Sequence, residues 1–101
     1  MGLLSKLFGQ QVDIAGLIGK GAKVIDVRSP QEFAGGHVKG SVNVPLDRIR
    51  GEIPALKKAC VPVILCCASG MRSRNATSIL ADAGIEAYNG GSWASVSRFV
   101  K

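Results

Sequence analysis

The segment VILCCASGMRSRN, from Val63 to Asn75, contains two adjacent cysteines followed by small residues, a serine and two arginines. A cysteine acts as a nucleophile in its thiolate form, so its surroundings must favour negative charge. The only histidine of the chain, His37, lies well before this segment. The pattern therefore predicts a cysteine nucleophile that is activated without an adjacent histidine base.

Three features of the segment favour a thiolate. The apolar run leads through a loop to a helix that starts near Ser73, and the N–H groups and dipole at a helix N-terminus attract negative charge. The small residues Ala68, Ser69 and Gly70 let the loop backbone curl so that several N–H groups point inward. Arg72 adds a permanent positive charge suited to an oxyanion. We therefore expect a lowered pKa for a cysteine at the base of this loop.

The alternation of side chains along a strand separates the two cysteines. Val63, Leu65 and Cys67 share one orientation, and Ile64 and Cys66 share the other. Cys66 still belongs to the apolar run, so we expect it to pack in the core as a small hydrophobic residue. Cys67 stands where the strand gives way to the loop, which makes it the expected nucleophile.

The elements that must position this loop alternate between strand and helix. Short β-branched runs predict strands, and capping residues with helical spacing predict helices. Such alternation indicates an α/β fold with a central parallel sheet and helices on both faces, whose ligands lie at the carboxyl ends of strands. The predicted strands are 23–27, 41–45, 62–66 and 86–89, with 62–66 central and a turn at Gly90 and Gly91. The predicted helices are 13–18, one from Ser29 to the glycines at 35 and 36, 46–49, 52–58, 73–83 and 92–100.

Composition narrows the class of protein. The 101 residues predict a single domain, 1–101, and thirteen basic against seven acidic residues give a net charge of +6, which favours anionic ligands. The basic residues are scattered and not interleaved with aromatics, so no nucleic-acid partner is expected.

The three cysteines have neither a disulfide-framework nor a metal-site spacing. No run approaches membrane-spanning length, and we expect a cytoplasmic protein without a membrane partner.

Three motifs in order resemble a known family. DVRSPQEFAGGHVKGSVNVPL, from Asp26 to Leu46, is similar to the first signature of single-domain rhodanese sulfurtransferases. CASGMRS, from Cys67 to Ser73, is similar to their active-site loop, and YNGGSW to the glycine turn and aromatic that follow. The resemblance spans roughly Val24 to Trp93. It implies a rhodanese-like fold.

The resemblance also implies a chemistry. Cys67 would form a persulfide with sulfane sulfur from a small anionic donor such as thiosulfate, and pass it to cyanide or to a protein thiol such as that of a thioredoxin. No metal or organic cofactor is implied. The residues expected to bind the donor are Arg72, Ala68, Ser69, Gly70, Met71 and Ser73.

Two other functions compete with this one. Counted from Cys66, Arg72 completes the C-x5-R spacing of cysteine-dependent phosphatases, whereas counted from Cys67 the spacing is C-x4-R, typical of rhodaneses. The shorter loop forms a tighter ring of amides, which suits sulfur better than a phosphoryl group. A non-catalytic rhodanese-like module that carries sulfur for a partner is the other alternative. A vicinal disulfide would give Cys66 a resolving role, but its ring is strained.

Further polar residues near the expected pocket have simpler roles. Asp26 and Arg28 end a strand, and we expect them to form a supporting ion pair or hydrogen-bond network rather than to act in acid–base catalysis. Glu32 is the expected helix cap. His37 is expected to make structural hydrogen bonds, and Trp93 to belong to the core or to the pocket wall.

Overall fold

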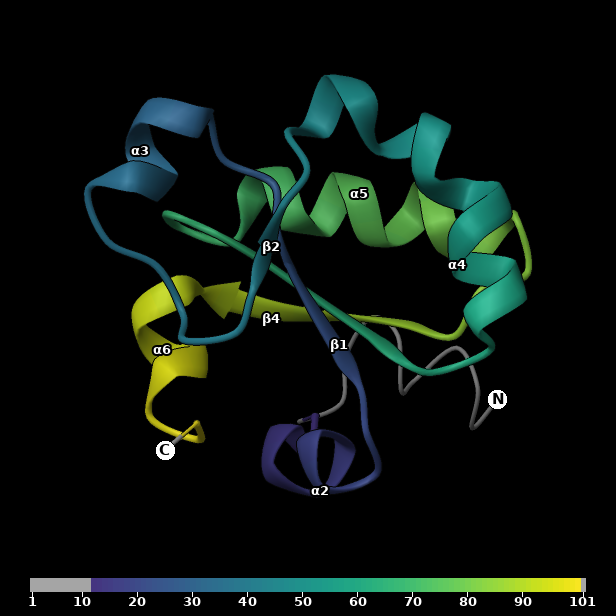
Figure 1. Cartoon of the computed structure of the whole chain (residues 1–101), viewed down its shortest axis with the longest axis horizontal. Coiled ribbons are helices and arrows are strands. Elements are labelled where there is room, and N and C mark those ends of the chain that lie inside the picture. Colours follow the sequence, from purple (N-terminus) through teal and green to yellow (C-terminus); the bar gives the residue numbers. More distant parts are fainter. Residues whose placement is uncertain (1–11, 101) are drawn as a thin grey trace.

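A four-stranded parallel sheet forms the centre of the protein, for which a computed structural model describes residues 12–100. Its strand order is β2-β1-β3-β4, so β1 and β3 are the inner strands. Figure 1 shows the strands crossing the middle of the molecule between helices. The strands are β1 (Lys23–Asp26), β2 (Val42–Asn43), β3 (Val63–Cys67) and β4 (Ala87–Ser92).

Helices cover both faces of the sheet, as the alternating pattern predicts. One core contains residues of η1 (Leu46–Glu52), α4 (Ile53–Ala59) and α5 (Met71–Asp82). The other contains residues of α2 (Ile14–Gly19) and α6 (Trp93–Ser97). Within residues 12–100, no helix has the length and apolar character needed to cross a membrane.

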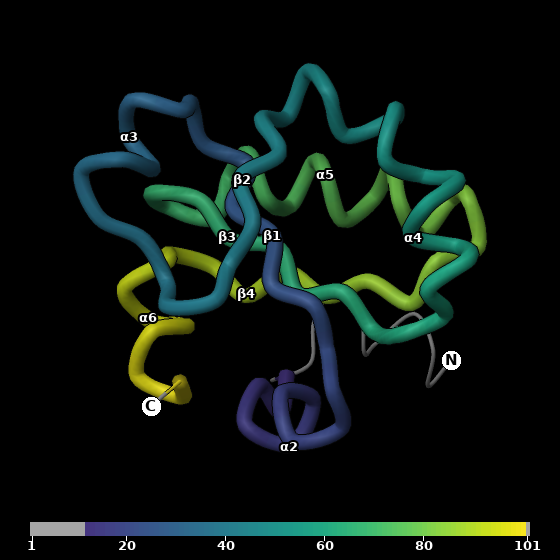
Figure 2. The backbone as a smooth tube through the Cα atoms, viewed as in Figure 1, coloured from purple at the N-terminus to yellow at the C-terminus, as the bar shows by residue number. Residues whose placement is uncertain are grey.

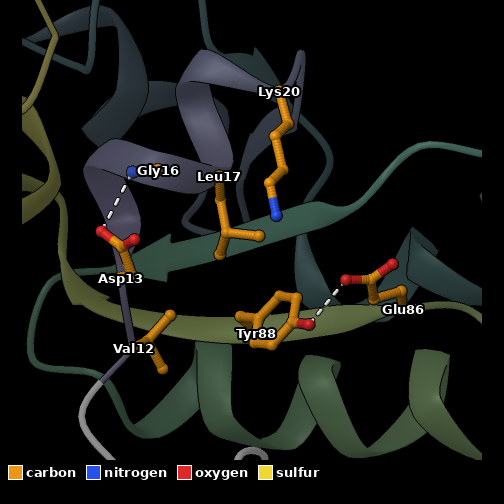
Figure 3. Close-up of a pocket in the computed structure, with 7 residues that line it drawn as sticks. All are labelled: Val12, Asp13, Gly16, Leu17, Lys20, Glu86 and Tyr88. Atoms are coloured by element: carbon orange, nitrogen blue, oxygen red, sulfur yellow. Dashed lines mark hydrogen bonds between the residues drawn. The ribbon is translucent and has the colours of Figure 1, made fainter.

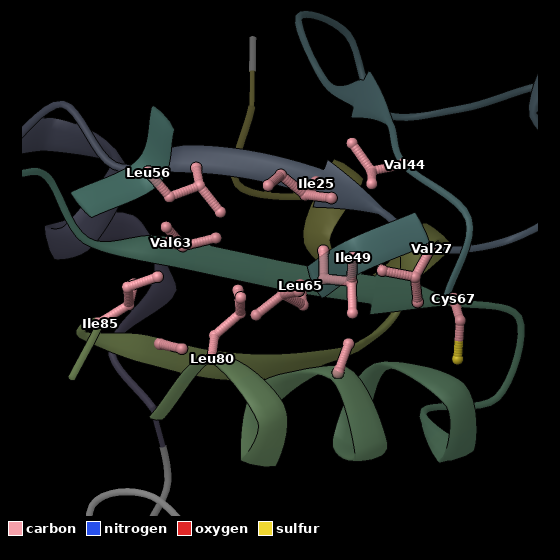
Figure 4. Packing of buried hydrophobic residues seen from close by; sticks show 12 residues of the cluster. Ile25, Val27, Val44, Ile49, Leu56, Val63, Leu65, Cys67, Leu80 and Ile85 are labelled. Atoms are coloured by element: carbon pink, nitrogen blue, oxygen red, sulfur yellow. The ribbon is translucent and has the colours of Figure 1, made fainter. Parts of the chain in front are cut away.

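Strand β3 is buried on both sides, with all five residues inaccessible to solvent. Val63, Leu65 and Cys67 pack in the core beneath α5 (Figure 4), and Ile64 and Cys66 pack in the core beneath α2 and α6. The predicted central strand and its alternation are therefore confirmed. The two adjacent cysteines lie on opposite faces of the sheet.

The short helix α3 (Pro30–Ala34) has the capping box that the sequence predicts. The Ser29 hydroxyl accepts the N–H of Glu32 (3.2 Å), and the Glu32 carboxylate accepts the N–H of Ser29 (3.0 Å). Figure 2 shows α3 at the end of the sheet where the loop after β3 also lies. Capping therefore fixes the Glu32 side chain at the edge where ligands of α/β folds bind.

The sequence analysis is wrong about Gly90 and Gly91, which lie within β4 and do not form a turn between strand and helix. The register passes from Leu65 opposite Asn89 to Cys66 opposite Gly91, so Gly90 is the extra residue of a β-bulge. A Cβ at Gly90 would lie 2.7 Å from Val96 Cγ2 and 2.9 Å from Ile64 Cγ2. Glycine is needed there because the backbone approaches the core closely. Helix α5 also begins two residues earlier than expected, at Met71.

Gly90→Ala should therefore destabilise the fold. The added methyl group meets two buried, branched side chains that have no room to move, and overpacking of this kind costs about 1–3 kcal/mol. Gly51→Ala is the matched control, because a Cβ there meets nothing within 4 Å. Urea unfolding should give a lower midpoint for Gly90→Ala and an essentially unchanged one for Gly51→Ala. Equal midpoints would contradict the close packing at the bulge.

Candidate active site

The sulfur of Cys67 lies at the carboxyl end of β3 and receives hydrogen bonds from the loop that follows. The N–H of Gly70 donates to Sγ at 3.0 Å and the N–H of Ser73 at 3.4 Å. The Ser73 hydroxyl lies 3.4 Å from the same sulfur. Figure 4 shows the sulfur directed toward the first turn of α5. The two N–H groups form the inward-pointing set of donors that the loop sequence predicts.

The two cysteines ionise very differently. Burial opposes ionisation of Cys67, but hydrogen bonds from the Ser73 side chain and from the backbone of Ser73, Gly70 and Ser69 outweigh it and lower the pKa of this thiol. Burial, with a smaller contribution from the charge of Asp26, raises the pKa of Cys66 to about 12. Of the two neighbours, only Cys67 is held in surroundings that favour the thiolate.

Gly70 makes the tight loop possible. Its φ angle is 100°, a conformation that disfavours any residue with a side chain, and it occupies the N-cap position of α5. A Cβ at this position would also lie 3.4 Å from the Cα of Gly91. Glycine at 70 therefore lets its own N–H turn toward the Cys67 sulfur while α5 starts one residue later.

Asn89 of β4 is a site residue that the sequence analysis missed. Its amide nitrogen donates to the Gly70 carbonyl (3.2 Å), and its amide oxygen accepts from the Ser73 hydroxyl (2.6 Å) and from the N–H of Gly91 (3.0 Å). It therefore ties Gly70 and Ser73 to the bulge in β4. The Ser73 hydroxyl has one hydrogen, so donating it to a Cys67 thiolate would require rotation away from Asn89.

Arg72, the loop arginine, is paired with Glu32 of α3. Its Nη1 donates to Oε1 at 2.8 Å and its Nη2 to Oε2 at 3.0 Å, and both side chains are a little under two-fifths exposed. The hydrogen bond from Arg72, together with that from the backbone of Ser29, lowers the pKa of Glu32 to about 2. Glu32 thus acts as the predicted cap and also as an ion-pair partner that the sequence analysis did not foresee.

Asp26 and Arg28 form a buried ion pair beside the loop. The Arg28 Nη2 lies 2.8 Å from Asp26 Oδ2 and also donates to the Gly36 carbonyl at 2.6 Å. The guanidinium carbon lies 5.0 Å from the centre of the Trp93 ring. The pair therefore links β1, the segment after α3 and the start of α6. The expected ion pair is therefore present, and its supporting role at the loop stays a prediction.

His37 lies outside the set of groups around the sulfur. Its ring is exposed, stacks on Phe33 with centroids 3.7 Å apart and bonds the Phe33 carbonyl through Nδ1 (2.7 Å). These contacts match the structural hydrogen bonding expected of this residue.

The remaining loop residues lie at the surface above the thiol. Ala68, Ser69 and Met71 are exposed, and Met71 is 74% exposed, whereas Cys67 itself has no exposed surface. A groove of about 660 Å³ runs beside Arg72 between η1 and α5, lined also by Ser29, Arg50 and Ile79. The loop therefore covers the sulfur of Cys67.

A second hollow, of about 260 Å³, lies between α2 and β4 (Figure 3). Tyr88 and Glu86 line it, and the Tyr88 hydroxyl donates to the Glu86 carboxylate at 2.6 Å. Burial and this hydrogen bond raise the pKa of Tyr88 to about 12. The α2 helix packs on the face of the sheet opposite to Cys67, so this hollow is separate from the loop.

Solved structures of similar proteins include sulfurtransferases. A structure described as a rhodanese with anions from E. coli is 30% identical, with a TM-score of 0.67, and the match covers 73% of this chain and 89% of that one. The human single-domain sulfurtransferase TSTD1 is 25% identical, with a TM-score of 0.68 and coverage of 82% and 88%. Both likenesses extend over most of the two chains compared.

Sequence comparison gives the same relationship. The uncharacterized protein YqhL of Bacillus subtilis is 42% identical over an alignment of 72 residues that covers 67% of this chain. The chain spans about half the length of that relative, 54% of which is covered. The family model described as "Rhodanese-like domain" matches residues 11–95. With this match over most of its length, the chain belongs to the rhodanese-like domain family.

Proposed function

We propose that the protein is a sulfurtransferase that moves sulfane sulfur from thiosulfate or a persulfide donor to a thiophilic acceptor through a persulfide on Cys67. The observation that carries the proposal is the convergence of the Gly70 and Ser73 N–H groups and the Ser73 hydroxyl on one sulfur atom. Hydrogen bonds to sulfur stabilise the thiolate before reaction and negative charge on sulfur during it. Family membership and the sulfurtransferases among its structural relatives support the same chemistry.

In the first half-reaction, the Cys67 thiolate attacks the outer sulfur of thiosulfate. A sulfur–sulfur bond forms to Cys67, the sulfur–sulfur bond of the donor breaks, and sulfite leaves with the electron pair. No proton is transferred, so no histidine base is required, and this is consistent with the position of His37 outside the site. The products are the Cys67 persulfide and sulfite.

In the second half-reaction, an acceptor nucleophile attacks the outer sulfur of the persulfide. Cyanide leaves as thiocyanate, or a thiolate leaves as a new persulfide, and the Cys67 thiolate is restored. The exposed Met71 and the groove beside Arg72 provide surface for an acceptor larger than cyanide. A protein thiol, such as that of a thioredoxin, is an acceptor of this kind.

The phosphatase alternative requires Cys66 as the nucleophile. Cys66 packs in the core beneath α2 and α6, and its raised pKa of about 12 keeps it protonated at neutral pH. The C-x5-R count therefore starts from a residue that cannot reach the loop. A sulfur carrier that hands its persulfide only to a partner protein uses the same Cys67 chemistry, and the tests below separate it from an enzyme.

Cys67→Ser should abolish transfer of sulfur from thiosulfate to cyanide, because it removes the atom that carries the sulfur. Cys66→Ala should keep most of the activity and lose up to about 2 kcal/mol of stability, because the lost sulfur leaves a small cavity. Thiocyanate formation measures the first effect and thermal unfolding the second. An inactive but folded Cys66→Ala protein would show that the nucleophile is misassigned.

The pKa of Cys67 should lie below the value of roughly 8.5 for a free thiol. The rate of Cys67 alkylation should rise with pH and level off at a lower pH than for a free thiol. Ser73→Ala should move the inflection of this curve to higher pH, because two of the hydrogen bonds to the sulfur involve Ser73 and one uses its side chain. The Cys60→Gly, Cys66→Ala background isolates the site, and glycine suits position 60, where φ is 56°. An unchanged inflection in Ser73→Ala would contradict the role given to this residue.

The protein should turn over thiosulfate and leave an aryl phosphate intact. A loop counted from Cys67 is too tight for a phosphoryl group, whereas one added sulfur fits against the N–H groups. Mass spectrometry after exposure to thiosulfate should find one extra sulfur on Cys67. Persulfide formation without turnover to cyanide or to small thiols would identify a carrier, and hydrolysis of the phosphate would overturn the proposal.

A further inference from the structure

We propose that Glu32 sets the charge preference of the sulfur donor, so that the site disfavours doubly charged anions such as thiosulfate relative to singly charged ones. This inference rests on the proposed function and names the class of donor at the same site. Its basis is the two-point pairing of the Glu32 carboxylate with the loop arginine, Arg72.

The ion pair with Glu32 neutralises the positive charge by which Arg72 was expected to attract an anionic donor. Arg72 stands in the first turn of α5, one residue before the Ser73 N–H that contacts the sulfur. Both of its terminal nitrogens donate to Glu32 at 2.8 and 3.0 Å. The other arginine at the site, Arg28, is matched in the same way by buried Asp26. Arg72, the cation that the sequence analysis expected to bind an anionic donor, therefore has a carboxylate beside it.

The carboxylate is held in place from a second side. Glu32 Oε1 also accepts the N–H of Ser29 in the capping box of α3, so the helix start fixes where the negative charge stands. Glu32 remains ionised throughout the pH range of an assay, since its pKa is lowered to about 2 by the hydrogen bond from Arg72 and by that from Ser29. A donor that approaches Arg72 therefore always meets this negative charge.

The work of bringing a donor near a fixed charge is proportional to the charge of the donor. Thiosulfate carries two negative charges and methanethiosulfonate carries one, while both present a terminal sulfur on an oxidised sulfur atom. With methanethiosulfonate, the Cys67 thiolate takes the terminal sulfur, the donor's sulfur–sulfur bond breaks and methanesulfinate leaves with the electron pair. Comparison of the two donors therefore measures charge at nearly constant shape.

Glu32→Gln is the decisive variant. The glutamine amide oxygen can still accept the N–H of Ser29, since glutamine serves in capping boxes, but its NH2 group cannot accept from Arg72. We expect kcat/KM to rise about tenfold for thiosulfate and about threefold for methanethiosulfonate, because the logarithm of the effect doubles with the charge. The difference should shrink at about 1 M salt, where screening is strong.

Two matched controls separate charge from structure. Ser29→Ala removes the other half of the capping box but keeps the Glu32 charge, so the ratio of the two donors should stay as in the parent protein. Asp82→Asn changes the net charge by the same amount at the last residue of α5 and should also leave the ratio unchanged. An equal change for both donors in Glu32→Gln, or a loss of activity with both, would overturn the inference and leave a structural ion pair.

A binding measurement keeps this test independent of turnover. In a Cys67→Ser background, calorimetry should find that Glu32→Gln binds thiosulfate more tightly, by a larger factor than it binds methanethiosulfonate. If the parent protein, with Cys67 intact, forms no persulfide from either donor, this binding result would retain the charge preference while the sulfurtransferase proposal fails. If the protein is an active enzyme but Glu32→Gln changes the affinity for the two donors by the same factor, only the charge preference would be refuted.

Discussion

Backbone N–H groups of Gly70 and Ser73 converge on the sulfur of Cys67, and the surrounding fold keeps them there. Burial alone would suppress ionisation of this thiol, as it does for Cys66, so the contact determines which of the two neighbours has the lowered pKa. The contact requires a strand that ends at Cys67 and a helix that starts at Met71. The buried position of β3 between two cores fixes where the strand ends, and the conformation of Gly70 allows the helix to start at Met71.

Two neighbouring elements hold the loop from outside. The bulge in β4 places Asn89 where its amide reaches both the Gly70 carbonyl and the Ser73 hydroxyl. Helix α3 reaches the loop through the Glu32–Arg72 pair. The first support consists of neutral hydrogen bonds and sets geometry. The second consists of charges and, by our proposal, sets the electrostatic potential beside Arg72, so geometry and potential depend on different parts of the chain.

Local signals in the sequence predicted much of this arrangement. The capping box at Ser29 depends on residues three positions apart, and the assignment of Cys67 depends on alternation within one strand. Asn89 and the Glu32–Arg72 pair were not foreseen, because these contacts join residues that are far apart in the chain. The paired glycines at 90 and 91 suggested a turn, since the pattern alone does not distinguish a turn from a bulge that needs close packing.

The opposite orientations of Cys66 and Cys67 also determine how the protein tolerates oxidants. An oxidised cysteine is commonly rescued when a second thiol attacks it and forms a disulfide. Cys66 faces the other core, and Cys60 precedes the opposite end of β3, so neither can reach the Cys67 sulfur while the strand stays in the sheet. Neither Cys60 nor Cys66 can therefore rescue a sulfenic acid at Cys67, and oxidation beyond that stage removes this thiol irreversibly.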